Sequence, residues 1–255
     1  MMYNFYNSNN QIQYILHFPD LYNNGLKKYF YDEVAQLREP IISKKISIVS
    51  ISNLDCILQS PLYRQIPQTH KLYTDDDYIK IESKDWNNLL KIDGILNVLK
   101  HVKTEYCLIT DLADVLIVND LDDKFINKFN SLGYDVVFNG QSTKFPLMQV
   151  ENLLDILTNI NDVKYLNAGV CFGKTQALLD FYRYVNYIKS TTKPSNTWRD
   201  NKPSEQYYVR LAKEKYKGYK IGIDDNRLLF TVCLDQEVDF EKANNDKIII
   251  KMKGK

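Results

Sequence analysis

Apolar and polar residues alternate in short blocks along the chain, and most blocks have the length of one strand or one helix. Short apolar or alternating runs predict strands at residues 11–18, 46–51, 106–110, 135–138, 165–173, 220–223, 228–232 and 247–251. Apolar residues at helical spacing predict helices at residues 26–37, 84–100, 124–129, 147–157, 175–188 and 204–216. Because strands alternate with helices through most of the chain, we expect an α/β/α sandwich with a mostly parallel central sheet.

The whole chain is predicted to form one domain. Its 255 residues are 44% hydrophobic and 25% charged, a globular composition with enough apolar material for a sizeable core. The sequence contains no internal repeat and no Gly/Ser-rich linker that would separate two units. Residues 1–255 are therefore interpreted as a single domain, in which residues 1–45 contribute an additional strand and helix.

Charge, the length of apolar runs and the cysteine pattern indicate which partners and which location to expect. The net charge is +1 and the lysines are scattered, which argues against nucleic acid or an anionic membrane as partner. No apolar run approaches the roughly 20 residues that span a bilayer, so no transmembrane segment is expected. The cysteines include no C-x-x-C pair and are predicted to be reduced, and no signal-peptide pattern is present. These features favour a cytoplasmic location.

The stretch at residues 106–120, Y-C-L-I-T-D-L-A-D-V-L-I-V-N-D, carries the most informative chemistry. A buried strand is predicted at its start, and Asp111 and Asp114 follow that strand. Open α/β sheets bind ligands at the carboxyl ends of their strands, and neighbouring carboxylates repel one another unless a positive charge lies between them. The pair is therefore predicted to hold a divalent cation that carries substrate phosphates. A capped turn between strand and loop is the structural alternative.

Three further stretches offer polar groups, and each has a structural alternative. Asn167 and Gly169 interrupt a predicted strand, where they would either approach a hydroxyl-rich ligand or form a β-bulge. Glu205 begins a predicted helix after a proline-containing loop, and it would act as a base or complement the helix dipole. Asp224 and Asp225 form a turn or contribute to a polar site.

Several common catalytic motifs are absent from the sequence. It contains no H-E-x-x-H, no G-x-x-x-x-G-K-[ST] and no G-x-G-x-x-G, which argues against a zinc hydrolase, a P-loop NTPase and a dinucleotide-binding oxidoreductase. His17, His70 and His101 lie far apart in the sequence and outside the stretches that carry the candidate site residues. No histidine is therefore assigned to the site.

Taken together, these stretches resemble a GT-A type glycosyltransferase, and in particular its lysyl hydroxylase-associated and collagen glycosyltransferase-like group. The resemblance runs from residue 46 to the C-terminus, and the order and spacing of several motifs carry it. The matching segments are I-S-I-V-S-I-S-N at 46–53, T-D-L-A-D-V at 110–115, D-V-V-F-N-G-Q at 135–141, Y-L-N-A-G-V-C-F-G at 165–173, S-E-Q-Y-Y-V at 204–209 and Y-K-I-G-I-D-D-N-R-L-L-F at 219–230.

The resemblance implies transfer of a sugar from a nucleotide-diphosphate donor, UDP-linked, to a hydroxyl group of a glycan, lipid-linked or protein acceptor. It implies Mn²⁺ or Mg²⁺ at Asp111 and Asp114, where the cation would stabilise the leaving diphosphate. Whether the transfer retains or inverts configuration stays open. The other residues that the resemblance implies are, for donor and cofactor, Ser52, Asn53, Lys91, Asp111, Gly169 and Lys251 and, for catalysis and sugar orientation, Glu205, Asn167 and Gln141.

Three departures from the family pattern bear on these assignments. The family's late histidine, its third metal ligand, is replaced by Lys251 in I-I-I-K-M-K-G at 248–254. A protonated lysine cannot ligate a cation, so either the two aspartates, water and diphosphate hold the metal, or Lys251 neutralises phosphate. Ser204 stands where the first acid of the family's D-D-Q segment is expected, which leaves Glu205 as the carboxylate. Residues 1–45 have no counterpart in the family.

Two other functions are compatible with the sequence. A nucleotidyltransferase also combines a doubly wound sheet with acidic metal ligands, but it normally needs a Gly-rich basic loop after the first strand. Residues 52–60 contain no Gly, Lys or Arg, which disfavours this alternative. A non-catalytic module that binds a nucleotide sugar is the second alternative, and the missing late histidine favours it.

Overall fold

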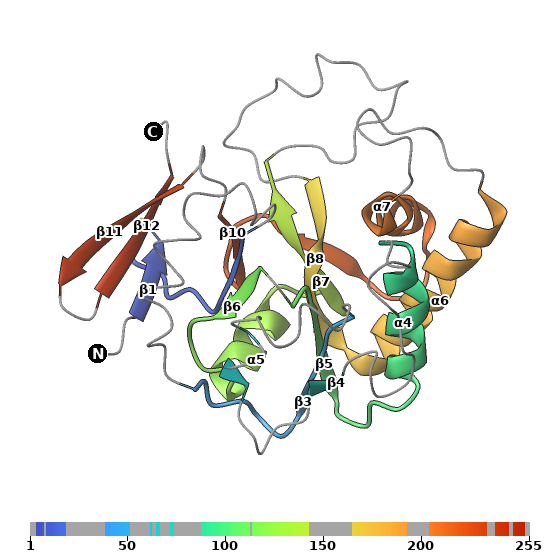
Figure 1. The fold of residues 1–255 in the computed structure, drawn as a ribbon, viewed down its shortest axis with the longest axis horizontal. Helices are drawn as coiled ribbons and strands as arrows, with labels where there is room; N and C mark the ends of the chain where they lie inside the picture. The colour runs from blue at the N-terminus through green and yellow to red at the C-terminus, as the bar shows by residue number, and fades with distance from the viewer. Residues whose placement is uncertain are drawn as a thin grey trace, which may run out of the picture.

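The structure is a computed structural model that describes residues 4–7, 9–18, 39–51, 62, 65–66, 72–73, 88–112, 114–142, 165–192, 204–233, 238–244 and 247–252. These residues form a mixed α/β fold with three sheets (Figure 1). The helices predicted at 26–37 and 147–157 lie outside the described residues, as do residues 193–203 of the predicted loop. In the described part of the chain, no helix combines the length and apolar character needed to cross a membrane.

The central sheet has six strands in the order β4-β3-β5-β8-β7-β9. Strand β8 runs antiparallel to both of its neighbours, β5 and β7, whereas the remaining pairs are parallel. The sheet is therefore mixed, and the prediction of a mostly parallel sheet is not supported, because alternation of strands and helices along a sequence does not fix strand direction. The strands are β3 (Ile46–Val49), β4 (Leu72–Tyr73), β5 (Tyr106–Thr110), β7 (Val136–Gln141), β8 (Tyr165–Lys174) and β9 (Ile221–Asp224).

Two smaller sheets extend the fold. The first has the order β10-β2-β6, from β2 (Ile15–His17), β6 (Val115–Ile117) and β10 (Phe230–Val232). The second lies at one side of the molecule (Figure 1) and contains β1 (Asn4–Asn7), β11 (Val238–Asn244) and β12 (Lys247–Met252). Both sheets combine a strand from the first 45 residues with strands from much later in the chain. The N-terminal segment is thus an integral part of the fold.

Helices cover the two faces of the central sheet unequally. Helices α4 (Leu90–Leu99), α6 (Thr175–Thr191) and α7 (Glu205–Lys215) pack together on one side (Figure 1), and their apolar residues share a core with β5, β7 and β8. Helix α5 (Asp123–Ser131) packs with β2 and β6 in a second core. Its amphipathic face buries Phe125, Ile126 and Phe129. Asp122 caps α5, and Ser204 caps α7 as its position before the helix predicts.

The order of the strands identifies the edge where a ligand site is expected. After β3 the chain moves outward to β4, and it later returns to place β5 on the opposite side of β3. Such a reversal opens a crevice outside the carboxyl ends of the strands, where open α/β sheets bind their ligands. Asp111 is the first residue after β5, so the fold places it at the edge of the sheet where such a crevice is expected.

Candidate metal centre

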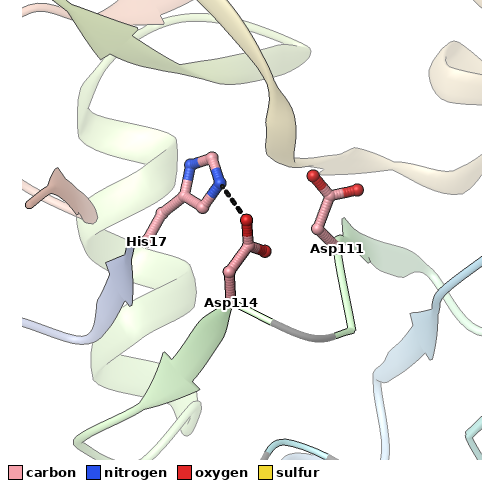
Figure 2. A group of neighbouring side chains, drawn as sticks. All are labelled: His17, Asp111 and Asp114. Carbon is pink, nitrogen blue, oxygen red and sulfur yellow. Dashed lines mark ion pairs between the residues drawn. The ribbon is translucent and has the colours of Figure 1, made fainter. Parts of the chain in front are cut away.

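Three side chains from two distant parts of the sequence meet at the carboxyl end of β5. His17 is the last residue of β2, Asp111 follows β5, and Asp114 precedes β6. Strands β2 and β6 pair antiparallel with His17 opposite Val115, and the Phe18 amide donates to the Asp114 carbonyl at 2.8 Å. Figure 2 shows the imidazole ring and the two carboxylates directed toward a common space.

The geometry of these side chains fits a divalent cation. One ligand atom from each of His17, Asp111 and Asp114 lies within 4.8 Å of the others, and His17 Nε2 is 3.5 Å from Asp114 Oδ2 (Figure 2). The Asp114 Oδ1 atom is buried and makes no hydrogen bond within the described part of the chain, although a buried carboxylate oxygen normally has a partner. A bound cation would supply that partner.

The set of donor atoms also indicates which cations the cluster suits. Carboxylate oxygens are the usual ligands of Mg²⁺, Ca²⁺ and Mn²⁺, whereas imidazole is favoured by transition ions. Two carboxylates with one imidazole nitrogen therefore suit Mn²⁺ better than Mg²⁺.

A bulge in β8 makes room for the histidine ring. Between β7 and β8, Phe138 pairs with Cys171 but the next residue, Asn139, pairs with Asn167, so residues 168–170 of β8 have no counterpart in β7. Gly169 lies in this bulge and accepts a hydrogen bond from the Asp111 amide at 2.7 Å. A Cβ atom on Gly169 would lie 2.4 Å from His17 Cε1 and 2.9 Å from Asp111 Oδ2. A side chain at position 169 would therefore displace the His17 ring or the Asp111 carboxylate, and glycine allows both to approach the β8 backbone.

Lys91 joins the cluster to helix α7. Its ammonium group lies 2.6 Å from Asp111 Oδ1 and 3.3 Å from Glu205 Oε1. Burial opposes the charge of Lys91, but the carboxylates of Asp111 and Glu205 outweigh this effect and raise the pKa of Lys91 above its ordinary value. Burial raises the pKa of Asp111; the Lys91 ammonium opposes that rise, whereas the Asp114 carboxylate adds to it. The sequence prediction that Lys91, Asp111 and Glu205 belong near one site therefore agrees with their contacts.

Buried side-chain amides shape the bulge next to the cluster of His17, Asp111 and Asp114. Asn167 Nδ2 donates to Gln141 Oε1 at 2.7 Å, and Asn167 Oδ1 accepts from the Gly169 amide at 2.8 Å. Gln206 Oε1 accepts from the Ala168 amide at 3.1 Å. The side chains of Asn167 and Gln141 thus hold the two strands in the conformation that places Gly169 against His17. In the structure, Asn167 and Gln141 therefore bond to each other and to the bulge. Their contact with a sugar stays a prediction.

The other predicted site residues are placed differently. Ser52 and Asn53 lie outside the described residues. Lys251 lies in β12, which pairs with β1 and β11 in the side sheet and not with the central sheet. The side chain of Lys251 is outside what the structure describes, so its role toward phosphate stays a prediction.

His17 is the residue that the sequence interpretation missed. The interpretation left all histidines outside the site and sought a third ligand only near Lys251. Instead, the N-terminal strand β2 supplies an imidazole beside both aspartates. The one available signal was a polar residue near the end of the apolar run at 11–18. That signal is weak, because it does not show that β2 pairs with β6.

Asp224 has a different environment at the carboxyl end of β9. Its Oδ1 accepts from the Leu228 amide at 2.8 Å, and its Oδ2 accepts from the amides of Leu229 and Phe230 at 2.6 and 2.9 Å. Burial raises the pKa of Asp224, and these three donors oppose the rise. Of the two alternatives considered for Asp224, the structure supports the turn.

Comparison with known proteins does not identify the family. No protein-family model matches the chain, and a search of curated proteins finds no match. Among solved structures, one match is 4-diphosphocytidyl-2C-methyl-D-erythritol synthase from Anaerococcus prevotii, with 12% identity and a TM-score of 0.34, over 70% of this chain and 85% of that one. A TM-score this low establishes neither a shared fold nor a shared activity. The resemblance to the collagen glycosyltransferase-like group receives no support from these comparisons.

Proposed function

We propose that this protein is a divalent-metal-dependent glycosyltransferase that uses a nucleotide-diphosphate sugar. The observation that carries the proposal is the His17, Asp111 and Asp114 cluster at the carboxyl end of β5. One buried carboxylate oxygen of this cluster has no hydrogen-bond partner among the described residues. The motifs that resemble a GT-A type glycosyltransferase surround this same point of the chain.

The charges around the cluster explain why a metal would be needed. Asp111, Asp114 and Glu205 carry three negative charges and Lys91 carries one positive charge; with a neutral His17 the sum, −3 + 1, is −2. A diphosphate would be repelled by a crevice of this charge, whereas one divalent cation neutralises it. The cluster is thus suited to a substrate that arrives with, or binds to, a divalent cation.

Each residue of the cluster has a proposed role. His17, Asp111 and Asp114 would hold Mn²⁺ or Mg²⁺, which when bound acts as a Lewis acid toward the leaving diphosphate. Gly169 leaves the space that the imidazole occupies. The ammonium group of Lys91 lies beside Asp111, and Glu205, at the start of α7, would orient that ammonium group.

The residues that contact the sugar or acceptor are proposed from the positions of buried side-chain amides, and the donor and acceptor classes are proposed from the sequence resemblance. Asn167 and Gln141, at the bulge between β7 and β8, are the proposed contacts to sugar or acceptor hydroxyls. The donor is proposed to be UDP-linked, and the acceptor is a hydroxyl of a glycan, a lipid-linked sugar or a protein. A cytoplasmic location and a donor contact by Ser52 and Asn53 remain part of the proposal.

The proposal is tested with a panel of nucleotide sugars, each incubated with the protein in Mn²⁺ and in EDTA. Release of nucleoside diphosphate that depends on Mn²⁺ is the expected result. Release of pyrophosphate from a nucleoside triphosphate and a sugar phosphate would instead indicate nucleotidyl transfer. Binding of nucleotide sugars without transfer or hydrolysis, across several metals and acceptors, would indicate a non-catalytic module.

A further inference from the structure

Asn139 is a buried side chain that contacts the cluster without belonging to the proposed metal ligands. It lies in β7 at the register shift opposite β8, and it is fully buried. Its Nδ2 atom is 3.4 Å from His17 Nδ1, on the side of the ring opposite Asp114. Its Oδ1 atom is buried and has no hydrogen-bond partner within the described residues.

The orientation of this amide determines which tautomer His17 can adopt. A neutral imidazole carries its proton on one ring nitrogen and offers a lone pair on the other. With the amide nitrogen facing Nδ1, only the lone pair fits there, so the proton lies on Nε2 and points toward Asp114 Oδ2. That tautomer cannot bind a cation through Nε2, because a ligating nitrogen needs its lone pair.

A half-turn of the same amide gives the opposite tautomer. The carboxamide oxygen of Asn139 would then face Nδ1 and accept its proton, and the Nε2 lone pair would be directed at Asp111 and Asp114. Ligating histidines in proteins almost always donate their second ring N–H to such an oxygen.

We propose that Asn139 is a positioning residue that selects the metal-binding tautomer of His17 by accepting a hydrogen bond from Nδ1–H. This inference rests on the proposed metal site. An amide is suited to the task because it presents either an acceptor or a donor to the ring at no change in charge.

Mn²⁺ binding alone, measured by calorimetry without nucleotide, tests the assignment. Asn139→Leu removes the acceptor at similar volume and is expected to weaken Mn²⁺ binding by about 10- to 100-fold. Asn139→Asp keeps an acceptor for Nδ1–H and is expected to bind Mn²⁺ at least as tightly as the parent protein.

A matched control separates this effect from general destabilisation. Asn119 is also buried, and its amide nitrogen donates to the backbone carbonyl of Gln13, which precedes β2. Asn119→Leu therefore removes a buried amide that anchors the same N-terminal segment without contacting His17. It is expected to lower the melting temperature while leaving Mn²⁺ affinity unchanged. Equal Mn²⁺ affinity in the parent and in Asn139→Leu would overturn the proposal.

The tautomer itself is measured on the unmutated protein, so the test does not depend on the folding of a variant. Protein labelled with ¹⁵N-histidine and loaded with Zn²⁺, a diamagnetic ion that accepts imidazole ligands, is expected to show His17 protonated at Nδ1 and not at Nε2. Protonation at Nε2 in the Zn²⁺-loaded protein would overturn the proposal. If the unmutated protein binds no divalent cation, the proposed metal site and the proposed function that depends on it are both wrong. If only the tautomer test fails, the role of Asn139 is wrong and the proposed transferase function still stands.

Discussion

Two carboxylate-bearing turns lie at the carboxyl ends of strands in the same sheet, yet they have opposite hydrogen-bonding states. Asp224, at the end of β9, is 1% exposed, and both of its oxygens accept backbone N–H groups. Asp114, before β6, has one buried oxygen that accepts no hydrogen bond in the described part of the chain, and its other oxygen lies 3.5 Å from His17 Nε2.

The difference separates a structural carboxylate from one that is proposed to bind a metal ion. In Asp224 the backbone itself supplies the donors, so the charge is compensated within its own turn. In the cluster of His17, Asp111 and Asp114, Lys91 compensates the carboxylates in part, and one carboxylate oxygen has no partner among the residues that the structure describes. A buried polar atom without a partner costs free energy, and such a cost is expected where a ligand later supplies the missing partner.

The largest expected effect is on catalysis, from Asp114→Asn. Loss of a metal ligand should remove several kcal/mol of transition-state stabilisation, so Mn²⁺-dependent nucleoside diphosphate release should fall by about 1,000-fold or more. The fold should remain intact, because the substitution removes repulsion between Asp111 and Asp114. Turnover of Asp114→Asn at the parent rate would show that Asp114 is not a metal ligand. Asp123→Asn, which neutralises an exposed acid of α5, is the matched control.

Asp224→Asn is expected to have the second-largest effect, and this effect is on the free energy of unfolding and not on turnover. An amide offers one acceptor oxygen, and its NH₂ group would face backbone donors, so the free energy of unfolding should fall by about 2–4 kcal/mol. Urea denaturation measures this loss, and calorimetry with Mn²⁺ should show unchanged affinity. A loss of Mn²⁺ affinity as large as that of Asp114→Asn would erase the distinction between the two turns.

A smaller effect is expected from Gly169→Ala. The new Cβ would lie 2.4 Å from the His17 ring, so the imidazole must move and Mn²⁺ affinity should fall by about 10- to 100-fold. Gly133→Ala is the control, because Gly133 has a φ of +72° and nothing within 4 Å of the added atom. It should destabilise the protein by about 1 kcal/mol through backbone strain and leave Mn²⁺ binding unchanged.

The smallest expected effect comes from Glu205→Gln. Glutamine keeps an oxygen that can accept from Lys91, so kcat for sugar transfer should fall by about tenfold or less and Mn²⁺ affinity should be nearly unchanged. Steady-state kinetics with the donor found in the panel measure kcat and KM separately. A 100-fold or larger loss in kcat at constant KM would instead assign Glu205 as the general base.

The sequence predicted the local features of the site and missed the long-range one. Asp111 and Asp114 were recognisable because a buried strand followed by acids is a local pattern, and Lys91, Glu205 and Gly169 lie where their motifs suggested. His17 was not recognisable, because its proximity to Asp114 depends on pairing between β2 and β6, about a hundred residues apart. Strand direction was missed for a similar reason, since β8 joins the sheet between strands that precede it in the chain.

The amino-acid sequence by itself determined the positions of helices α4 to α7, the buried strand β5 and the acidic pair after it, because hydrophobic periodicity and capping residues act over a few positions. The tertiary structure alone decided that the N-terminal strand completes the cluster, that Asp224 is satisfied by its own turn, and that Asn139 lies against His17. The physical reason is the same in each case: hydrogen-bond partners and ligand sets are made by atoms that meet only after the strands pair, and no local pattern records which strands those are.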